Sequence, residues 1–193
     1  MIVLGIDPGT RHFGWGVVAR TGTRLTHVAH GVIEAGMKQP LGERLVVIEK
    51  ELERIVRTHG ATAASIEGIF FAKDASAACK LGHARGVALL VCVRAGLEIG
   101  EYPPSRAKRA VTGSGRADKS QVALMIRAIL CLPAVPPSDA ADALALAVTH
   151  LQRMPMTPLR PASKGLDPLK PRKPLPAAPL RMNPPARRVV QRP

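Results

Sequence analysis

An apolar run that ends on a carboxylate, followed by a turn and a second apolar run, occupies residues 2–18 (IVLGIDPGTRHFGWGVV). Asp is among the residues least often fully buried without a partner, and Pro8-Gly9 is a strong turn signal. The pattern therefore predicts a strand with Asp7 at or near its end, then a turn and a second strand. Asp7 would lie at the rim of a sheet, where a ligand or a metal ion can be held.

The remainder of the first 151 residues alternates between strand-like and helical patterns. Further strands are expected at residues 24–34, 62–66 and 97–102. Apolar residues at helical spacing, small-residue runs and turn signals predict helices at residues 41–58, 73–95, 119–130 and 139–150, with a basic helical turn at 105–111. The first three strands should form an antiparallel meander. Gly60 is expected to stop the first helix, and Ser138 to cap the last one.

Positive charge is concentrated at the C-terminal end of the chain. The formal net charge is +14, and residues 152–193 hold ten Lys or Arg against one acid, together with 11 of the 18 prolines. That segment lacks apolar periodicity, so we expect a disordered basic tail at 152–193 behind one domain at 1–151. The charge favours a polyanionic partner, with nucleic acid ahead of an anionic membrane surface.

Cysteine usage and apolar runs limit the setting of the protein. Cys79, Cys92 and Cys131 are far apart and odd in number, so neither a disulfide framework nor a cysteine metal site is indicated. The longest strongly apolar stretch, residues 86–93, is far shorter than the roughly 20 residues of a membrane span. We therefore expect a cytoplasmic protein without a membrane partner.

Four acids stand out because apolar or small residues surround them: Asp7, Glu67, Asp139 and Asp142. Asp139 and Asp142 are three apart on a predicted helix, so both project from one face. Taken singly, Asp7 could form an Asx turn, Glu67 could be a surface acid, and Asp139 could complement the helix dipole. Asp142 has no basic residue one turn away in either direction.

If the four acids meet at one rim, their charges repel unless some carboxylates hold protons or a cation lies between them. Oxygen ligands suit Mg²⁺ or Mn²⁺, whereas zinc would call for His or Cys. Two such ions about 3.5–4 Å apart can activate a water and stabilise the leaving oxygen of a phosphodiester displacement. Combined with the basic surface, this chemistry predicts a nucleic-acid substrate.

Four segments resemble the RuvC family of Holliday-junction resolvases, within the ribonuclease H-like nuclease superfamily. They are residues 2–18, residues 66–89 (IEGIFFAKDASAACKLGHARGVAL), residues 113–122 (GSGRADKSQV) and residues 138–150 (SDAADALALAVTH). The resemblance covers residues 1–151 and leaves out the tail. It implies an α/β fold: a five-stranded mixed sheet flanked by helices, with Asp7 on a central strand and Glu67 on its neighbour.

The resemblance also implies how the protein acts. Asp7, Glu67, Asp139 and Asp142 match the metal-binding catalytic acids of the family, which would hold two Mg²⁺ ions, with Mn²⁺ as a substitute. The family implies a homodimer that places symmetric nicks in opposing strands of four-way junction DNA, and a RuvA/RuvB-type branch-migration complex as its partner. The small-residue helix at 73–95 is the candidate dimer interface.

Candidate DNA contacts come from the same resemblance. Lys108 and Lys119 match lysines that contact DNA near the cut, and Phe70 matches an aromatic residue that stacks on junction bases. Phe71 follows directly, so the choice between the two phenylalanines stays open. Arg85 and Arg116 are further candidates for phosphate contacts. The structural alternatives are core packing for the phenylalanines and a solvated face for the lysines.

His27 and His30 are three apart in a predicted strand. Because side chains alternate along a strand, they should lie on opposite faces, which argues against a joint metal site. The glycines around Asp7 should allow a DNA backbone or a neighbouring strand to approach closely.

The resulting hypothesis is a Mg²⁺-dependent crossover junction endodeoxyribonuclease that resolves Holliday junctions in DNA recombination and repair. One alternative is a ribonuclease H-like nuclease acting on RNA or another structured nucleic acid, because charge cannot separate DNA from RNA. A different class is the actin-like proteins, whose first phosphate loop is similar to residues 5–10; no second D-x-G-T turn follows. A junction-binding protein without catalysis is disfavoured by the four acids.

Overall fold

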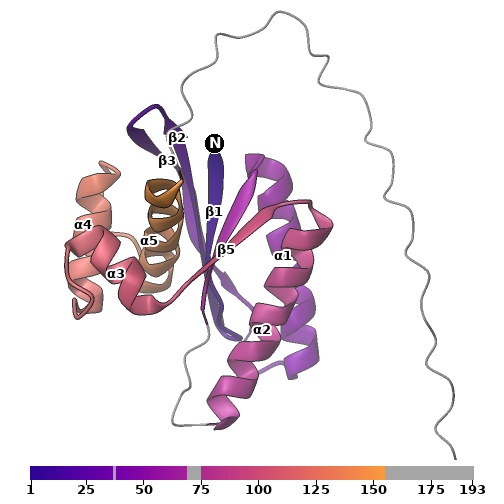
Figure 1. Cartoon of the computed structure of the whole chain (residues 1–193). Helices are drawn as coiled ribbons and strands as arrows, with labels where there is room; N and C mark the ends of the chain where they lie inside the picture. Colours follow the sequence, from indigo (N-terminus) through magenta and orange to yellow (C-terminus); the bar gives the residue numbers. More distant parts are fainter. Residues whose placement is uncertain (37, 69–74, 155–193) are drawn as a thin grey trace, which may run out of the picture. The chain divides into compact units, whose positions relative to one another are not determined.

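The computed structural model describes residues 1–36, 38–68 and 75–154, and these build a mixed sheet with helices on both faces (Figure 1). The strands are β1 (Ile2–Asp7), β2 (His12–Thr21), β3 (Arg24–Glu34), β4 (Ala63–Glu67) and β5 (Glu98–Tyr102). Their order in the sheet is β3-β2-β1-β4-β5. The pairs β1–β2 and β2–β3 are antiparallel, whereas β4 pairs with β1, and β5 with β4, in parallel. The predicted five-stranded mixed sheet, including its antiparallel meander, is therefore confirmed.

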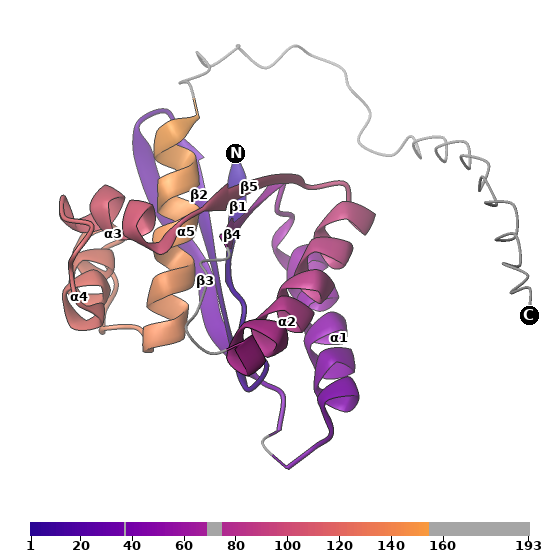
Figure 2. The ribbon, with the colours of Figure 1, turned by 60° about the horizontal axis from the view of Figure 1, so that its bottom comes forward.

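The helices divide between the two faces of the sheet. They are α1 (Leu41–His59), α2 (Ala75–Arg94), α3 (Pro104–Thr112), α4 (Lys119–Ile129) and α5 (Ser138–Arg153). Figures 1 and 2 show α1 and α2 on one side of the sheet and α5 on the other, with α3 and α4 beyond α5. Each face has its own apolar core, one containing Leu4 and Leu52 and the other containing Val3 and Leu144. None of the described helices is both long and apolar enough to cross a membrane.

Two of the predicted helix boundaries can be compared directly with the backbone. Gly60 ends α1 in the left-handed conformation at φ 59°, and its N–H bonds to Val56 O, as expected. The prediction that Ser138 caps α5 is wrong, because Ser138 is already helical and Pro137 precedes it as the N-cap residue. Proline fixes its own φ near the helical value, so the helix begins directly after it without a side-chain cap.

Helix α5 packs against the sheet through glycines of β1 and β2. A Cβ atom on Gly5 would overlap Ala143 O, and one on Gly14 would overlap Asp139 O. The expectation that a DNA backbone or a neighbouring strand approaches these glycines is wrong for Gly5 and Gly14, because the backbone of α5 takes that space. It is confirmed for Gly9, where a Cβ atom would overlap the carbonyl oxygen of His12 at the start of β2. The missing side chains let α5 lie close enough to bring its acidic first turns to the end of β1.

The edge strand β3 contains an irregularity that changes the direction of two side chains. Val17 pairs with Ala29 and Val18 with His27, so Val28 is an extra residue in β3. This bulge interrupts the alternation of side chains. Nε2 of His27 and Nδ1 of His30 are consequently 2.8 Å apart. The prediction that the two histidines lie on opposite faces is wrong for this reason.

Candidate active site

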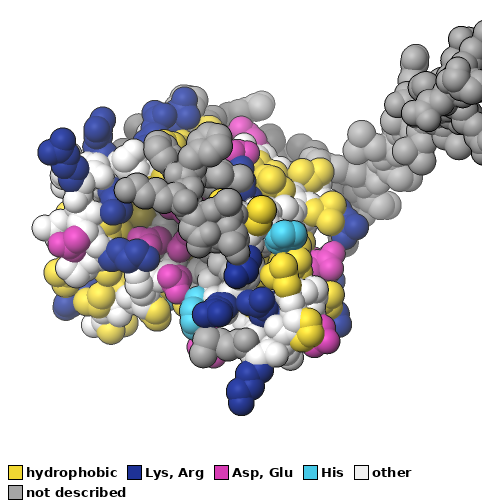
Figure 3. Space-filling model, turned by 90° about the horizontal axis from the view of Figure 1, so that it is seen from below, with side chains coloured by type: hydrophobic (Ala, Val, Ile, Leu, Met, Phe, Trp, Pro, Cys, Tyr) yellow, Lys and Arg dark blue, Asp and Glu magenta, His cyan; other side chains and the backbone are white. Residues whose placement is uncertain are grey.

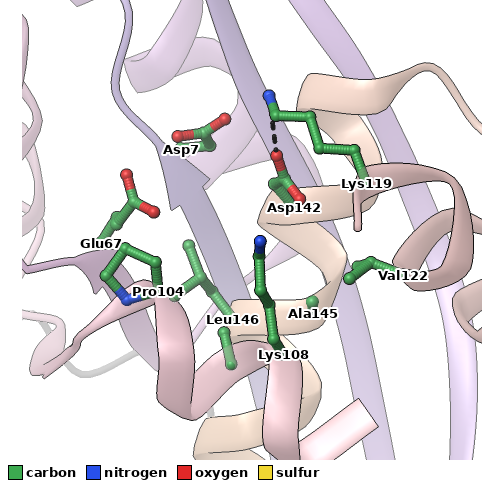
Figure 4. Close-up of a pocket in the computed structure, with 10 residues that line it drawn as sticks. Asp7, Glu67, Pro104, Lys108, Lys119, Val122, Asp142, Ala145 and Leu146 are labelled. Atoms are coloured by element: carbon green, nitrogen blue, oxygen red, sulfur yellow. Dashed lines mark ion pairs between the residues drawn. The ribbon is translucent and has the colours of Figure 1, made fainter. Parts of the chain in front are cut away.

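Three carboxylates meet where β1 and β4 end. Asp7 is the last residue of β1 and Glu67 the last residue of β4, and the two strands are parallel neighbours. The carboxyl ends of parallel neighbours lie at the same edge of a sheet. Asp142 reaches this edge from the second turn of α5, and Figure 4 shows the three carboxylates around one cleft.

Helices α3, α4 and α5 supply the other walls of the cleft. Its basic lining residues are Lys108 of α3 and Lys119 of α4. The remaining lining residues are Pro104, Ala107, Val122, Ala145 and Leu146. Asp139 lies one turn before Asp142 and is not among the described residues that line the cleft, yet its charge is close enough to raise the pKa of Asp7. The fold thus brings together three of the four predicted acids, with the fourth at the margin.

The carboxylates of the cleft hold protons more tightly than ordinary acids do. Burial, followed by the charges of Glu67, Asp142 and Asp139, raises the pKa of Asp7 to about 8. Burial and the charge of Asp142 raise the pKa of Glu67. Burial also raises the pKa of Asp142, although Lys119 opposes that shift. The positive charge near the three carboxylates is therefore too small to stabilise all of them in the ionised form, as expected of a site that binds cations.

Lys119 provides part of the compensating charge. Its Nζ is 3.4 Å from Oδ2 of Asp142, and the dashed line in Figure 4 marks this pair. Partial burial lowers the pKa of Lys119, but the charge and hydrogen bond of Asp142 raise it further, so the ammonium stays charged. A capping box positions the lysine at the start of α4: Asp118 accepts from Gln121 N, and the Gln121 side chain accepts from Asp118 N.

The donor set of the cleft fits a hard divalent cation. Asp7, Glu67 and Asp142 offer only carboxylate oxygens, which are the ligands that Mg²⁺ and Mn²⁺ prefer. Within the described ranges, no three Asp, Glu, His or Cys side chains are close enough to hold one ion as they stand. Binding would therefore require these side chains to turn toward the ion, a movement that the attraction of the cation favours and that the mutual repulsion of the carboxylates opposes.

The other predicted contact residues differ in accessibility. Arg116 is exposed in the connection between α3 and α4. Figure 3 shows Lys and Arg side chains beside acidic ones on the face of the molecule that is seen from below. Arg85 is only 7% exposed, and its guanidinium contacts Glu67 and Glu101 within the protein. Phe70 and Phe71 lie outside the described residues.

Sequence reasoning did not single out a second basic groove, on the side of α3 away from Lys108. It is lined by Arg106, Arg109, Ala110, Thr149, Gln152 and Arg153. The guanidinium carbons of Arg106 and Arg153 each lie 5.9 Å from the ring centroid of Tyr102. The spacing of Arg106 and Arg109 along one helical face could have indicated a basic stripe. The contribution of α5 could not have been read from the sequence, because it requires the packing of α3 on α5.

Comparisons with known proteins agree on one family. Residues 3–150 match the family model described as crossover junction endodeoxyribonuclease RuvC. A protein of that name from Sorangium cellulosum is 56% identical over 151 residues, covering 78% of this chain and 84% of the relative. Another from Parvibaculum lavamentivorans is 50% identical over 147 residues, covering 76% and 84%.

A solved structure gives the same result for the fold. The structure of T. thermophilus RuvC in complex with Holliday junction substrate superimposes with a TM-score of 0.73 at 38% identity, covering 78% of this chain and 93% of that one. This similarity confirms the ribonuclease H-like fold predicted from the sequence.

Proposed function

The chain belongs to the RuvC family of crossover junction endodeoxyribonucleases, and on that premise we propose that it resolves Holliday junctions by cutting DNA at the carboxylate cleft. The observation that carries the proposal is the meeting of Asp7, Glu67 and Asp142 beside Lys108 and Lys119. A relative with the same fold is bound to a Holliday junction substrate. Acids that gather cations, next to lysines that attract phosphate, are the groups that phosphodiester hydrolysis requires.

Asp7, Glu67, Asp139 and Asp142 would hold two divalent cations, Mg²⁺ or Mn²⁺, by this proposal. The raised pKa of Asp7 supports it, because a buried cluster of carboxylates is stabilised by positive charge. When bound, such ions stabilise the negative charge that develops on a phosphate and lower the pKa of water. Asp142 now pairs with Lys119 and would pair with the bound cations instead. Lys119 and Lys108 would then face phosphate oxygens of the DNA.

DNA contacts extend the proposal beyond the cleft. Arg116 is exposed in the connection between α3 and α4, three residues before Lys119 of the cleft, and we assign it a phosphate contact. The groove of Arg106, Arg109 and Arg153 offers a further path for the DNA backbone. Phe70 remains a proposed base-stacking residue, with Phe71 as the alternative.

A homodimer fits the two-fold symmetry of a four-way junction, which needs paired cuts. Leu90 and Val93 of α2 are 45% and 65% exposed, whereas Ala84 and Ala88 of the same helix are fully buried. Gly86 of α2 is also exposed, and a Cβ atom on Gly82 or Gly86 would meet nothing within 4 Å. The open face of α2 that carries these two glycines together with Leu90 and Val93 is therefore the proposed dimer contact. A RuvA/RuvB-type branch-migration complex is proposed as a further partner from the family alone.

The function is tested by a substrate panel. We expect the protein to make paired nicks in a labelled four-way junction with Mg²⁺, to leave linear duplex and RNA/DNA hybrid intact, and to lose activity in EDTA. Product analysis of a junction held in a plasmid separates paired from single nicks. Equal cutting of linear duplex would contradict junction selectivity, and cutting of the hybrid would favour an RNA substrate. Unpaired nicks would contradict the dimer, and ATP-dependent activity without cleavage would favour the actin-like class.

Removal of the basic C-terminal segment should weaken DNA binding without abolishing cleavage. The truncation is best placed after Met154, because the Met154 carbonyl accepts a hydrogen bond from Arg20 at 3.0 Å. The logarithm of the DNA-binding constant falls linearly with the logarithm of the salt concentration. Removing the segment should make this slope less steep by about 0.9 for every phosphate that the segment neutralises in the full chain. We expect a slope smaller by about 2–4, measured by fluorescence anisotropy of a labelled junction in EDTA at several salt concentrations. An unchanged slope would show that the segment does not contact DNA.

A further inference from the structure

Arg85 of α2 makes its contacts at the root of the predicted catalytic acid Glu67. Its Nη1 donates to the backbone carbonyl of Glu67 at 2.7 Å, and its Nη2 lies 2.5 Å from Oε2 of Glu101. Glu67 ends β4, and Glu101 lies on the adjacent β5, where it pairs with Ile66. Arg85 therefore joins α2 to the ends of two parallel strands at the edge where the carboxylates meet.

The peptide unit that follows Glu67 is held at both of its polar ends. The Glu67 carbonyl accepts from Arg85, and the N–H of Gly68 donates to Tyr102 O at 2.8 Å. These two groups belong to one planar peptide, so fixing both sets the rotation of that plane. The rotation determines ψ of Glu67 and hence the angle between its side chain and the chain that continues from it. Without Arg85, the plane would lose one of these two hydrogen bonds.

The burial of Arg85 argues against a role in binding phosphate. Its side chain is 8% exposed, whereas that of Glu101 is 52% exposed. A buried guanidinium is tolerated when charged and polar partners satisfy it, and here a carboxylate and a carbonyl do so. Turning outward to DNA would break both contacts and leave the Glu67 carbonyl without this donor.

We propose that Arg85, held in place by Glu101, is a positioning residue that fixes the direction of the Glu67 carboxylate toward the cation site. The inference rests on the proposed function, because it takes Glu67 as a ligand of a divalent cation. It replaces the interpretation of Arg85 as a phosphate contact. Groups that orient metal ligands affect metal affinity or activity about 10- to 100-fold when removed, because small angular errors separate a ligand from its ion.

The test compares Arg85→Gln, Arg85→Lys and Glu101→Gln with a matched control on the same helix. Arg94→Gln is that control, since Arg94 also pairs with a glutamate, Glu49, at 2.9 Å, but is 59% exposed and absent from the cleft lining. Mn²⁺ binding to the DNA-free protein is measured by electron paramagnetic resonance. Junction affinity in EDTA, the thermal midpoint and single-turnover cleavage are measured alongside.

Arg85→Gln should weaken Mn²⁺ binding about tenfold or more, while junction affinity in EDTA stays within about twofold. Higher Mn²⁺ should restore most of the cleavage rate. Arg85→Lys should recover part of the affinity, because an ammonium can still donate to the Glu67 carbonyl. Glu101→Gln should lose about threefold, since Arg85 keeps its carbonyl contact. Arg94→Gln should match the wild type.

Three results would overturn the positioning role. Loss of junction affinity with intact Mn²⁺ binding would make Arg85 a DNA contact. A lower thermal midpoint with unchanged Mn²⁺ binding would make its role purely structural. If Arg85→Gln fails to fold, Mn²⁺ binding as tight as that of the wild type in both Arg85→Lys and Glu101→Gln would equally rule out the positioning role. Failure of the proposed function gives a different result: Glu67→Gln would bind Mn²⁺ as tightly as the wild-type protein does, and neither the wild type nor any variant would cut a junction.

Discussion

Asp7→Asn is expected to reduce junction cleavage by about a thousandfold or more and, in the absence of metal, to raise the thermal stability of the protein. The loss of activity follows from the central place of Asp7, whose carboxylate shares the cleft with Glu67 and Asp142. The gain in stability follows from the same crowding, because burial and the neighbouring acids raise the pKa of Asp7 to about 8. One substitution should therefore separate function from stability.

The stability gain should depend on pH with a definite sign. A carboxylate whose pKa rises from 3.8 in the unfolded chain to about 8 in the folded one destabilises the fold progressively as pH rises between those values. Asn carries no charge at any pH, so its advantage should be small near pH 5 and about 1–3 kcal/mol above pH 8. For a domain of this size, that corresponds to a rise of about 3–10 °C in the unfolding midpoint.

Circular dichroism melts in EDTA at pH 5.5 and pH 8.5 measure this effect. Glu34→Gln is a suitable control, since Glu34 is an exposed acid at the end of β3. Saturating Mg²⁺ should stabilise the wild type more than the variant, because the variant lacks one of the charges that the ion compensates. A lower midpoint for Asp7→Asn at both pH values, or an equal gain at both, would contradict the electrostatic explanation. Cleavage by the variant at the wild-type rate would show that Asp7 is not a catalytic residue.

The strand ends of the site could be predicted from the sequence because their pattern is local. An apolar run that stops on an acid identifies Asp7 and Glu67 without knowledge of their neighbours, and helical spacing places Asp139 and Asp142 on one face. That β1 and β4 are parallel neighbours is a tertiary fact. It came from the family resemblance, because nothing in the periodicity of either strand indicates its partner.

The features that the sequence did not predict all depend on what packs across from a residue. Arg85 reads as a surface cation of a helix, since its partner Glu101 lies 16 positions further on, in a different strand. His27 and His30 share a face because of a bulge whose cause is the pairing of β3 with β2. The glycines of β1 and β2 indicated a close approach correctly, but the approaching element is α5 and could not be identified locally.

Gly14→Ala is expected to impair both stability and cleavage, because Gly14 lies between two of the acids. It pairs with Asp7 in the β1–β2 register, and a Cβ atom there would overlap the Asp139 carbonyl and approach Asp139 Cβ to 3.1 Å. The obstacle is helix backbone, which cannot rotate away as a side chain can. The first turn of α5 would have to move off the sheet, at a cost of about 2–4 kcal/mol.

The glycines of the sheet provide a graded comparison for this prediction. Gly16→Ala should cost less, since its nearest obstacles are Cγ and Cδ2 of the Leu144 side chain at 2.6 Å and its nearest backbone atom is Leu144 N at 3.1 Å, whereas at Gly14 the Asp139 carbonyl oxygen lies at 2.1 Å. Gly42→Ala in α1 meets nothing within 4 Å and should be neutral or stabilising by about 0.5–1 kcal/mol. Urea denaturation gives the free energies of unfolding, and single-turnover cleavage at saturating Mg²⁺ gives the effect on the site. If Gly14→Ala has the same free energy of unfolding as the wild type, α5 does not pack on β2 at this point. If the variant is less stable yet cuts at the wild-type rate, the position of Asp139 does not limit cleavage. A decrease in both stability and cleavage, larger than for Gly16→Ala, is the result that the packing of α5 requires.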